Sequence, residues 1–185
     1  MQNFQLKAEQ SLLLIVDVQE RLLPAVQSDK ADVLVSNLSI LMQAAVLFNV
    51  PTVVTEQYPK GLGHTIEPLQ PFLGTQGCWE KTAFSCMQDP AIEEHIKTHT
   101  RTHVVLCGIE THVCVLQTAL DLLTKGYHVH VMNDAVGSRT EDNRQTGLAM
   151  IQEAGGIISS TETAVFQWAG DSKHTEFKAL SRLVR

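Results

Sequence analysis

Residues 103–125 have the sequence HVVLCGIETHVCVLQTALDLLTK, in which a short apolar run is followed by a glycine turn and a helical pattern. The run His103–Cys107 predicts a strand buried on both faces, because apolar and polar residues do not alternate in it. Apolar residues then recur at helical spacing, which predicts a helix over Val113–Lys125 that ends before Gly126. Four side chains form its expected buried stripe: Val113, Leu116, Leu120 and Leu123.

Short apolar runs and longer helical patterns alternate along the rest of the chain. Further strands are expected at Leu12–Val16, Thr52–Thr55, His128–Met132 and Gly156–Ser159. Further helices are expected at Ala31–Phe48, Pro90–Thr98, Glu141–Ala154 and Lys173–Leu183. Gly155 is expected to close the third of these helices in the left-handed conformation. This alternation predicts an α/β protein with a parallel sheet.

The composition favours one folded domain that spans residues 1–185. The chain has 44% hydrophobic and 18% charged residues, values that argue against intrinsic disorder. With 20 acidic and 14 basic residues the net charge is -6, and lysine and arginine form no cluster, so no nucleic-acid partner is expected. No continuous apolar run approaches the roughly 18 residues of a spanning helix, so no membrane partner is expected.

Two features indicate a cytoplasmic protein. Residues 1–10 lack the basic, apolar and small-residue segments of a secretory signal peptide. The four cysteines form no C-x-x-C pair, and a chain of this length does not need disulfides to build its core. We therefore expect free thiols at Cys78, Cys86, Cys107 and Cys114.

The segment Gln57–Gly77 differs from the rest of the chain. It contains four glycines and three prolines and has little periodicity, which predicts a long connection. Long connections in compact domains are often functional, so this one is a candidate wall of a substrate pocket.

Polar side chains near the ends of predicted strands are the first candidates for chemistry, because ligands bind there in open parallel sheets. Asp17 directly follows the strand Leu12–Val16. Cys114 lies near a helix start, where the dipole and exposed amides favour a thiolate and can hold an oxyanion. Taken singly, Asp17 could be a helix cap, Cys114 an inert thiol and Lys81 a solvated surface lysine.

Three motifs make the chain resemble the isochorismatase-like (cysteine hydrolase) superfamily, which also contains nicotinamidases and carbamoylsarcosine amidases. They are Val16-Asp17-Val18-Gln19, Lys81 ahead of Thr82-Ala83-Phe84-Ser85, and Gly108-Ile109-Glu110-Thr111-His112-Val113-Cys114-Val115. Their order and spacing match the family over nearly the whole chain, and Asn133-Asp134-Ala135 is a further similar feature. The resemblance implies a three-layer α/β/α fold, with a Rossmann-like, open and mostly parallel sheet flanked by helices.

The resemblance also implies a catalytic triad of Asp17, Lys81 and Cys114. Asp17 would be the general acid and base, Lys81 an electrostatic activator, and Cys114 a nucleophile that forms a thioester with a small amide-type substrate. By analogy, the Ile109–Glu110 peptide would be cis, and the backbone amides of Glu110 and Cys114 would form an oxyanion hole.

Departures from the family's patterns bear on the metal and on the substrate. Nicotinamidases bind a divalent metal through a D-x-H-P loop, which corresponds here to Glu56-Gln57-Tyr58-Pro59, so Tyr58 replaces the histidine. No metal and no other cofactor is expected. Isochorismatases that cleave a vinyl ether commonly lack the cysteine, so Cys114 favours amide chemistry. The motifs are most similar to isochorismatase-domain-containing hydrolases, whose substrates the resemblance does not supply.

The resemblance and general trends also suggest a pocket and an assembly. Gln19 is expected to orient Asp17, and Tyr58, Trp79 and Phe84 are candidate pocket walls for a small-molecule substrate. Symmetric assembly is common in the family and among soluble proteins, which predicts a homo-oligomer, a dimer or larger.

Two other functions are compatible with the sequence. An enol-ether hydrolase of the isochorismate type would use Asp17 for proton transfer and would not need Cys114. A binding or scaffolding module would keep the fold without catalysis. A Cys–His dyad with His112 is disfavoured, because residues two apart on a helix point to different sides.

Overall fold

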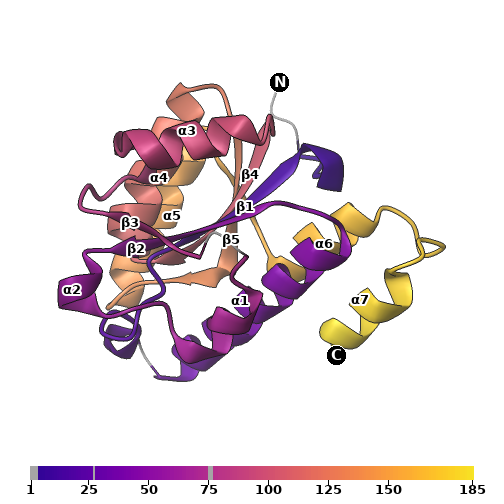
Figure 1. Ribbon diagram of the computed structural model, residues 1–185, viewed down its shortest axis with the longest axis horizontal. Helices are drawn as coiled ribbons and strands as arrows, with labels where there is room; N and C mark the ends of the chain where they lie inside the picture. The colour runs from indigo at the N-terminus through magenta and orange to yellow at the C-terminus, as the bar shows by residue number, and fades with distance from the viewer. Residues whose placement is uncertain (1–3, 27, 75–76) are drawn as a thin grey trace.

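The computed structural model describes residues 4–26, 28–74 and 77–185. Within these residues, six parallel strands form one sheet in the order β3-β2-β1-β4-β5-β6. Their bounds are β1 Ser11–Val16, β2 Thr52–Gln57, β3 Trp79–Lys81, β4 His103–Ile109, β5 His128–Gly137 and β6 Ile157–Ser159. Helices cover both faces of the sheet, so the predicted three-layer α/β/α architecture is confirmed (Figure 1).

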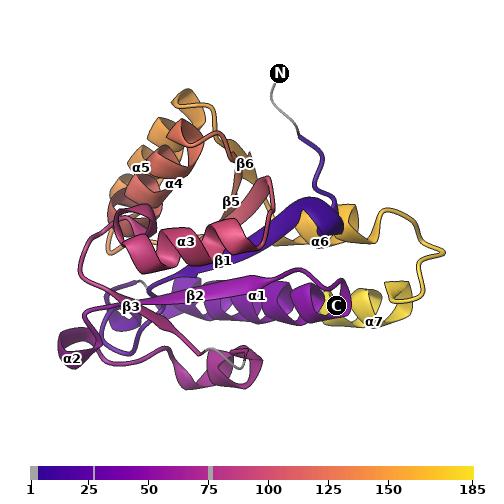
Figure 2. The same ribbon diagram turned by 45° about the horizontal axis from the view of Figure 1, so that its top comes forward.

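The helices form two layers on opposite faces of the sheet (Figure 2). One layer contains α3 Pro90–Thr98, α4 Leu116–Thr124 and α5 Glu141–Glu153. The other contains α1 Ser28–Leu47, α6 Thr161–Ala169 and α7 Phe177–Leu183. The short helix α2 Pro59–Leu62 lies in the connection between β2 and β3. Short 3-10 helices and one π turn also occur in the described residues: η1 Ala8–Gln10, η2 Leu23–Ala25, η3 Glu67–Phe72, η4 Cys86–Gln88 and the π turn η5 Thr111–Val115.

Helix α1 is unusually apolar. Its residues Lys30–Leu47 have a mean hydropathy of 1.3 over 18 residues, so this one helix of the described chain meets the length and composition of a membrane span. Core helices of globular proteins meet the same criterion, and α1 packs against β5, α6 and α7. Its apolar run is interrupted by Ser36, Asn37, Ser39 and Gln43, so the criterion is met by the average over the helix and not by a continuous apolar run.

Strands β1 and β4 lie side by side in the middle of the sheet. Both strands are buried along their whole length, as their uninterrupted apolar runs predict. The chain leaves β1 toward β2 on one side and leaves β4 toward β5 on the other, so the strand order reverses between them. In open parallel sheets this reversal creates a crevice at the carboxyl ends of the strands, where ligands bind.

Gly108 allows β4 to approach β1 closely at that crevice. Its φ is +120°, and a Cβ atom on it would lie 2.1 Å from the backbone oxygen of Val16. Only a residue without a Cβ fits this conformation and this distance. Gly108 therefore sets the position of Val16 and, with it, of Asp17.

Most predicted elements are present with shifted ends. β5 continues to Gly137 instead of ending at Met132, and α7 begins at Phe177 instead of Lys173. The left-handed Gly155 after α5 is confirmed by its φ of +101°. The predicted long connection Gln57–Gly77 contains α2 and η3, and its residues 75 and 76 lie outside the described residues.

Besides α2, the strand β3 and the helix α6 were not predicted. The edge strand β3 has only three residues, too few for a periodic pattern. Helix α6 begins where the Asp134 carboxylate accepts a hydrogen bond from the backbone N–H of Thr161 at 2.9 Å. The side chain of Ser160 also caps this helix, because its Oγ accepts a hydrogen bond from the backbone N–H of Thr163 at 3.3 Å, so the local sequence held a signal that was missed.

The stripe of residues predicted to be buried on the helix after β4 is not the face that the structure buries. Of its four members only Leu116 is buried, whereas Val113, Leu120 and Leu123 are half-buried. The buried residues of α4 are Leu116, Thr118, Ala119 and Leu122. Leu120 and Leu123 each lie one position after a buried residue, Ala119 or Leu122, so the buried face of α4 is rotated by about one residue from the predicted stripe.

Replacing Gly108 with alanine tests the contact between β4 and β1. We expect Gly108→Ala to lower the free energy of unfolding by about 3 kcal/mol or more, because backbone strain and a backbone clash add together. Gly126→Ala is the matched control: its φ is +87°, but nothing lies within 4 Å of the added Cβ. The control should lose only about 1–2 kcal/mol. Urea unfolding measures both, and equal losses would contradict the close approach.

Candidate active site

Asp17 directly follows β1 and is completely buried. Its φ of +54° is left-handed, a conformation that aspartate tolerates better than most residues, and it turns the chain out of the strand direction. Oδ1 accepts a hydrogen bond from Thr55 Oγ1 at 2.8 Å, and Oδ2 accepts one from Lys81 Nζ at 2.6 Å. Both oxygens bind side-chain donors, so the interpretation of Asp17 as a helix cap was wrong.

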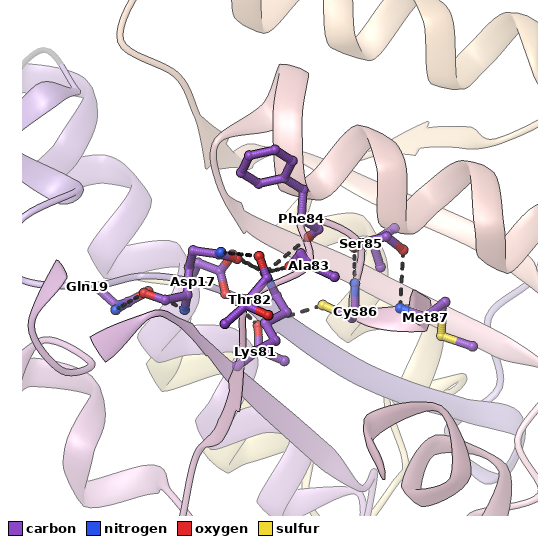
Figure 3. Close-up of polar contacts among 12 residues, drawn as sticks. Asp17, Gln19, Lys81, Thr82, Ala83, Phe84, Ser85, Cys86 and Met87 are labelled. Carbon is purple, nitrogen blue, oxygen red and sulfur yellow. Dashed lines mark hydrogen bonds and ion pairs between the residues drawn. The ribbon is translucent and has the colours of Figure 1, made fainter. Parts of the chain in front are cut away.

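Lys81 ends β3 and is 3% exposed, so it is not a solvated surface lysine. Besides Asp17, its Nζ contacts Gln57 Oε1 at 2.7 Å and the backbone oxygens of Phe84 at 3.0 Å and Ala83 at 3.3 Å (Figure 3). An ammonium group has three N–H donors, and these acceptors use all of them. Lys81 therefore acts on the site as a fixed positive charge and has no donor left for a substrate.

Cys114 lies in the π turn between β4 and α4 and is 6% exposed. Burial raises the pKa of its thiol, and the charge of the nearby Asp17 carboxylate raises this pKa further. Both effects oppose the thiolate that was expected at a helix start. Cys114 is a protonated thiol at neutral pH, with a carboxylate in place to accept its proton.

The turn that carries Cys114 is anchored at its first residue. The backbone N–H groups of Val113 and Val115 both donate to the backbone oxygen of Glu110, at 3.1 and 3.2 Å. The peptide bond between Ile109 and Glu110 is cis. The carboxylate of Glu110 forms an ion pair with Arg139 at 2.7 Å, and hydrogen bonds from Arg139 lower the pKa of this carboxyl group.

Gln19 does not orient Asp17 as expected. It is fully buried, and its Oε1 accepts a hydrogen bond from the backbone N–H of Gln57 at 2.7 Å. Its Nε2 donates to the backbone oxygens of Gln57 at 3.0 Å and Gly63 at 2.7 Å. The side-chain amide thus fixes the connection after β2, which in turn places the Gln57 side chain beside Lys81.

The three expected aromatic pocket walls have different surroundings. Trp79 stacks on His95 of α3, with ring centroids 4.6 Å apart, so it belongs to the packing between β3 and α3. The Phe84 ring is half exposed and points away from Asp17 and Lys81 (Figure 3). Tyr58 is also exposed and lines a depression of about 360 Å³ that includes Lys81. Only Tyr58 lines a cavity that Lys81 shares.

The described residues contain no group of three or more histidine, cysteine, aspartate or glutamate side chains that could hold a metal. Glu56, in the connection that resembles the metal loop of nicotinamidases, accepts hydrogen bonds from the backbone N–H and the hydroxyl of Thr65 at 2.6 and 2.8 Å. His64 Nδ1 lies 3.1 Å from the same carboxylate. His112 contacts the hydroxyl of Ser138 at 3.1 Å, which agrees with the rejection of a dyad with Cys114.

Sequence reasoning missed three residues of the site: Thr55, Gln57 and Arg139. Thr55 and Gln57 are two apart on β2, so they share a face, and this face points toward Asp17 and Lys81. Two polar residues at this spacing at the end of an apolar strand were the available signal. The pairing of Arg139 with Glu110, 29 residues earlier in the chain, had no signal in the sequence.

Comparison with known proteins shows which family this chain belongs to. Residues 11–163 match the family model described as the isochorismatase domain. The chain belongs to the isochorismatase family. The resemblance that the motifs indicated is thus confirmed, and the six-stranded parallel sheet is the fold of this family's structures.

Three relatives place the chain within the isochorismatase family. The secreted isochorismatase effector Isc1 of Phytophthora sojae is 43% identical over 186 residues, covering 95% of this chain and 84% of that protein. Isochorismatase domain-containing protein 2 of Bos taurus is 40% identical over 178 residues, covering 95% and 83%. The structure of MAR1 ribonuclease from Caenorhabditis elegans is 37% identical, covers 97% and 92%, and superposes with a TM-score of 0.90.

The raised pKa of Cys114 predicts how its thiol titrates. Because burial and the Asp17 carboxylate disfavour the thiolate, its ionisation should lie above that of an ordinary cysteine. The ultraviolet absorbance of thiolate, taken as wild type minus Cys114→Ala, should show no step between about pH 6 and 9. A step near neutral pH would contradict the protonated resting thiol.

Proposed function

We propose that the chain is a metal-independent cysteine hydrolase that cleaves a C–N bond of a small amide-type substrate through a thioester. The observation that carries the proposal is the buried ion pair of Asp17 and Lys81, 2.6 Å apart, with the Cys114 thiol close enough for the Asp17 charge to raise its pKa. A thiol, a carboxylate and a fixed positive charge therefore lie near one another at the carboxyl ends of the strands, which favours nucleophilic catalysis.

The first half-reaction forms the acyl-enzyme. As the Cys114 sulfur attacks the carbonyl carbon, the thiol proton moves to Asp17, because a thiol with a raised pKa must lose its proton during the attack. The carbonyl oxygen becomes an oxyanion, which the backbone amides of Glu110 and Cys114 stabilise. Collapse of this intermediate breaks the C–N bond, and Asp17 returns the proton to the leaving amine.

The second half-reaction releases the acid. Asp17 takes a proton from water, and the resulting hydroxide attacks the thioester carbon. The C–S bond breaks, the acyl group leaves as a carboxylic acid, and the proton returns to the Cys114 sulfur. Lys81 takes no part in these proton transfers and holds the Asp17 side chain in place through their 2.6 Å ion pair.

The names of two relatives suggest other chemistry. The Phytophthora protein is called an isochorismatase, which supports enol-ether hydrolysis as a second candidate, with Asp17 as the proton donor. The worm structure is called a ribonuclease. RNA hydrolysis is less well supported for this chain, because its net charge is -6 and the Lys81 ammonium is fully occupied by protein acceptors. A non-catalytic binding module stays a further alternative.

We also propose a cytoplasmic location and a homo-oligomeric state. The first rests on the composition and on the four cysteines, all within the described residues and all unbridged. The second rests on the frequency of symmetric assembly. Light scattering of the purified chain measures its mass in solution, and a monomer would contradict the second proposal.

Substitution of Cys114 is the decisive test of the proposed function. Intact-mass spectrometry after brief exposure to small amides and to p-nitrophenyl acetate should show an acyl adduct on wild type and none on Cys114→Ala or Cys114→Ser. Cys78→Ala is the matched control, because Cys78 is half-buried and burial raises the pKa of its thiol to about 11. This control should form the adduct like wild type.

Two further arms of the same experiment separate the alternatives. Isochorismate and a short RNA are offered to wild type, Cys114→Ala and Asp17→Asn. Isochorismate turnover that persists in Cys114→Ala and is lost in Asp17→Asn would replace the thioester with proton transfer at Asp17. RNA cleavage that survives the loss of Cys114 would equally refute the amide hydrolase, and no reaction at all would favour the binding module.

A further inference from the structure

The segment that follows β5 holds the turn that carries Cys114. Thr111 Oγ1 donates a hydrogen bond to the backbone oxygen of Gly137 at 3.0 Å. The next residue of each segment is also in contact, since His112 Nδ1 lies 3.1 Å from Ser138 Oγ. Three consecutive residues, 137–139, therefore contact three consecutive residues, 110–112.

Arg139 makes the strongest of these contacts. Its Nε donates to Glu110 Oε1 at 2.9 Å and its Nη2 donates to Oε2 at 2.7 Å, a planar two-pronged pairing. Its backbone N–H also donates to Oε1 at 3.1 Å. Glu110 is largely buried, whereas the Arg139 side chain is more than half exposed. Through this pair, a residue at the surface restrains the position of a buried residue.

Restraint at Glu110 is transmitted to both neighbours of Cys114. The backbone oxygen of Glu110 accepts the N–H groups of Val113 and Val115, so a movement of Glu110 shifts the turn on both sides of the thiol. Helix α5 limits the opposite side, because Gly147 leaves no room for a Cβ atom, which would lie 2.9 Å from the backbone oxygen of Thr111. The turn is thus held between α5 and the Arg139 pair.

We propose that Arg139 is a positioning residue, which acts through Glu110 to hold the turn carrying Cys114 and the amides around it. The effect of Arg139 on catalysis rests on the proposed function. Its restraint of the turn is independent of that function. Arg139 also neutralises the Glu110 carboxylate. Without Arg139, a negative charge would lie on the same residue whose amide is proposed to stabilise an oxyanion.

Two reagents distinguish this role from a purely structural one. Acylation of Cys114 by p-nitrophenyl acetate passes through an oxyanion, whereas alkylation by iodoacetamide is a direct displacement that forms none. In Arg139→Ala the acylation rate should fall about tenfold or more, because small misplacements of catalytic groups cost one to two orders of magnitude. Alkylation should fall by less than about threefold, since the thiol and its base are retained.

Matched variants test whether Arg139 acts through Glu110. Arg139→Lys keeps one charged contact and should recover part of the acylation rate. The double variant Arg139→Ala/Glu110→Gln should be no slower than the slower single variant, because the two side chains act as one pair. Lys125→Ala is the control: it removes an ion pair with Glu93 at 2.6 Å on the surface between α3 and α4, and both rates should stay unchanged.

Amide hydrogen exchange of the whole chain supplies a readout that does not depend on the reaction. Residues 108–116 should exchange faster in Arg139→Ala than in wild type and the Lys125→Ala control. Unchanged exchange there, or acylation within about twofold of wild type, would overturn the inference and leave the proposed function intact. If wild type itself is not acylated, the proposed function fails, and the exchange of residues 108–116 alone decides the role of Arg139.

Discussion

The buried ion pair between Lys81 and Asp17 constrains the whole carboxyl edge of the sheet. Both side chains are withdrawn from water, a cost that the structure offsets only by giving each charged atom hydrogen-bond partners. Thr55 completes the shell of Asp17, while Gln57 and two backbone oxygens complete that of Lys81. The short edge strand β3, the connection fixed by Gln19 and the end of β2 are all required to hold these two charges together.

The position of the carboxylate depends on backbone geometry as much as on charge. Asp17 leaves β1 in the left-handed conformation while its N–H still donates to the Thr55 oxygen at 3.1 Å. Gly108 brings β4 against Val16 one residue earlier, so the strand that leads to Cys114 and the strand that leads to Asp17 are closest where the site begins. The proximity of Cys114 and Asp17 therefore follows from the sheet itself.

The elements that sequence predicted are those governed by local pattern. Helix Pro90–Thr98 was predicted with its observed bounds, because Asp89 caps it and Pro90 begins it, and the runs in β1 and β4 matched buried central strands. The three motifs likewise predicted Asp17, Lys81 and Cys114 as a group, and the first two form a buried ion pair. One failure was a local signal that was overlooked, since Ser160 caps the missed helix α6. Others came from interactions between distant segments, because Arg139 holds Glu110 and burial raises the pKa of the Cys114 thiol.

The charge balance of the site explains how a protonated thiol is compatible with the proposed chemistry. At rest, the negative Asp17 and the positive Lys81 cancel, and Cys114 is neutral. When the thiol proton moves to Asp17, the carboxylate becomes neutral and the new negative charge lies on the substrate oxygen. The positive charge of Lys81 stays in place during this step, so the buried site keeps the same net charge from the resting state to the oxyanion.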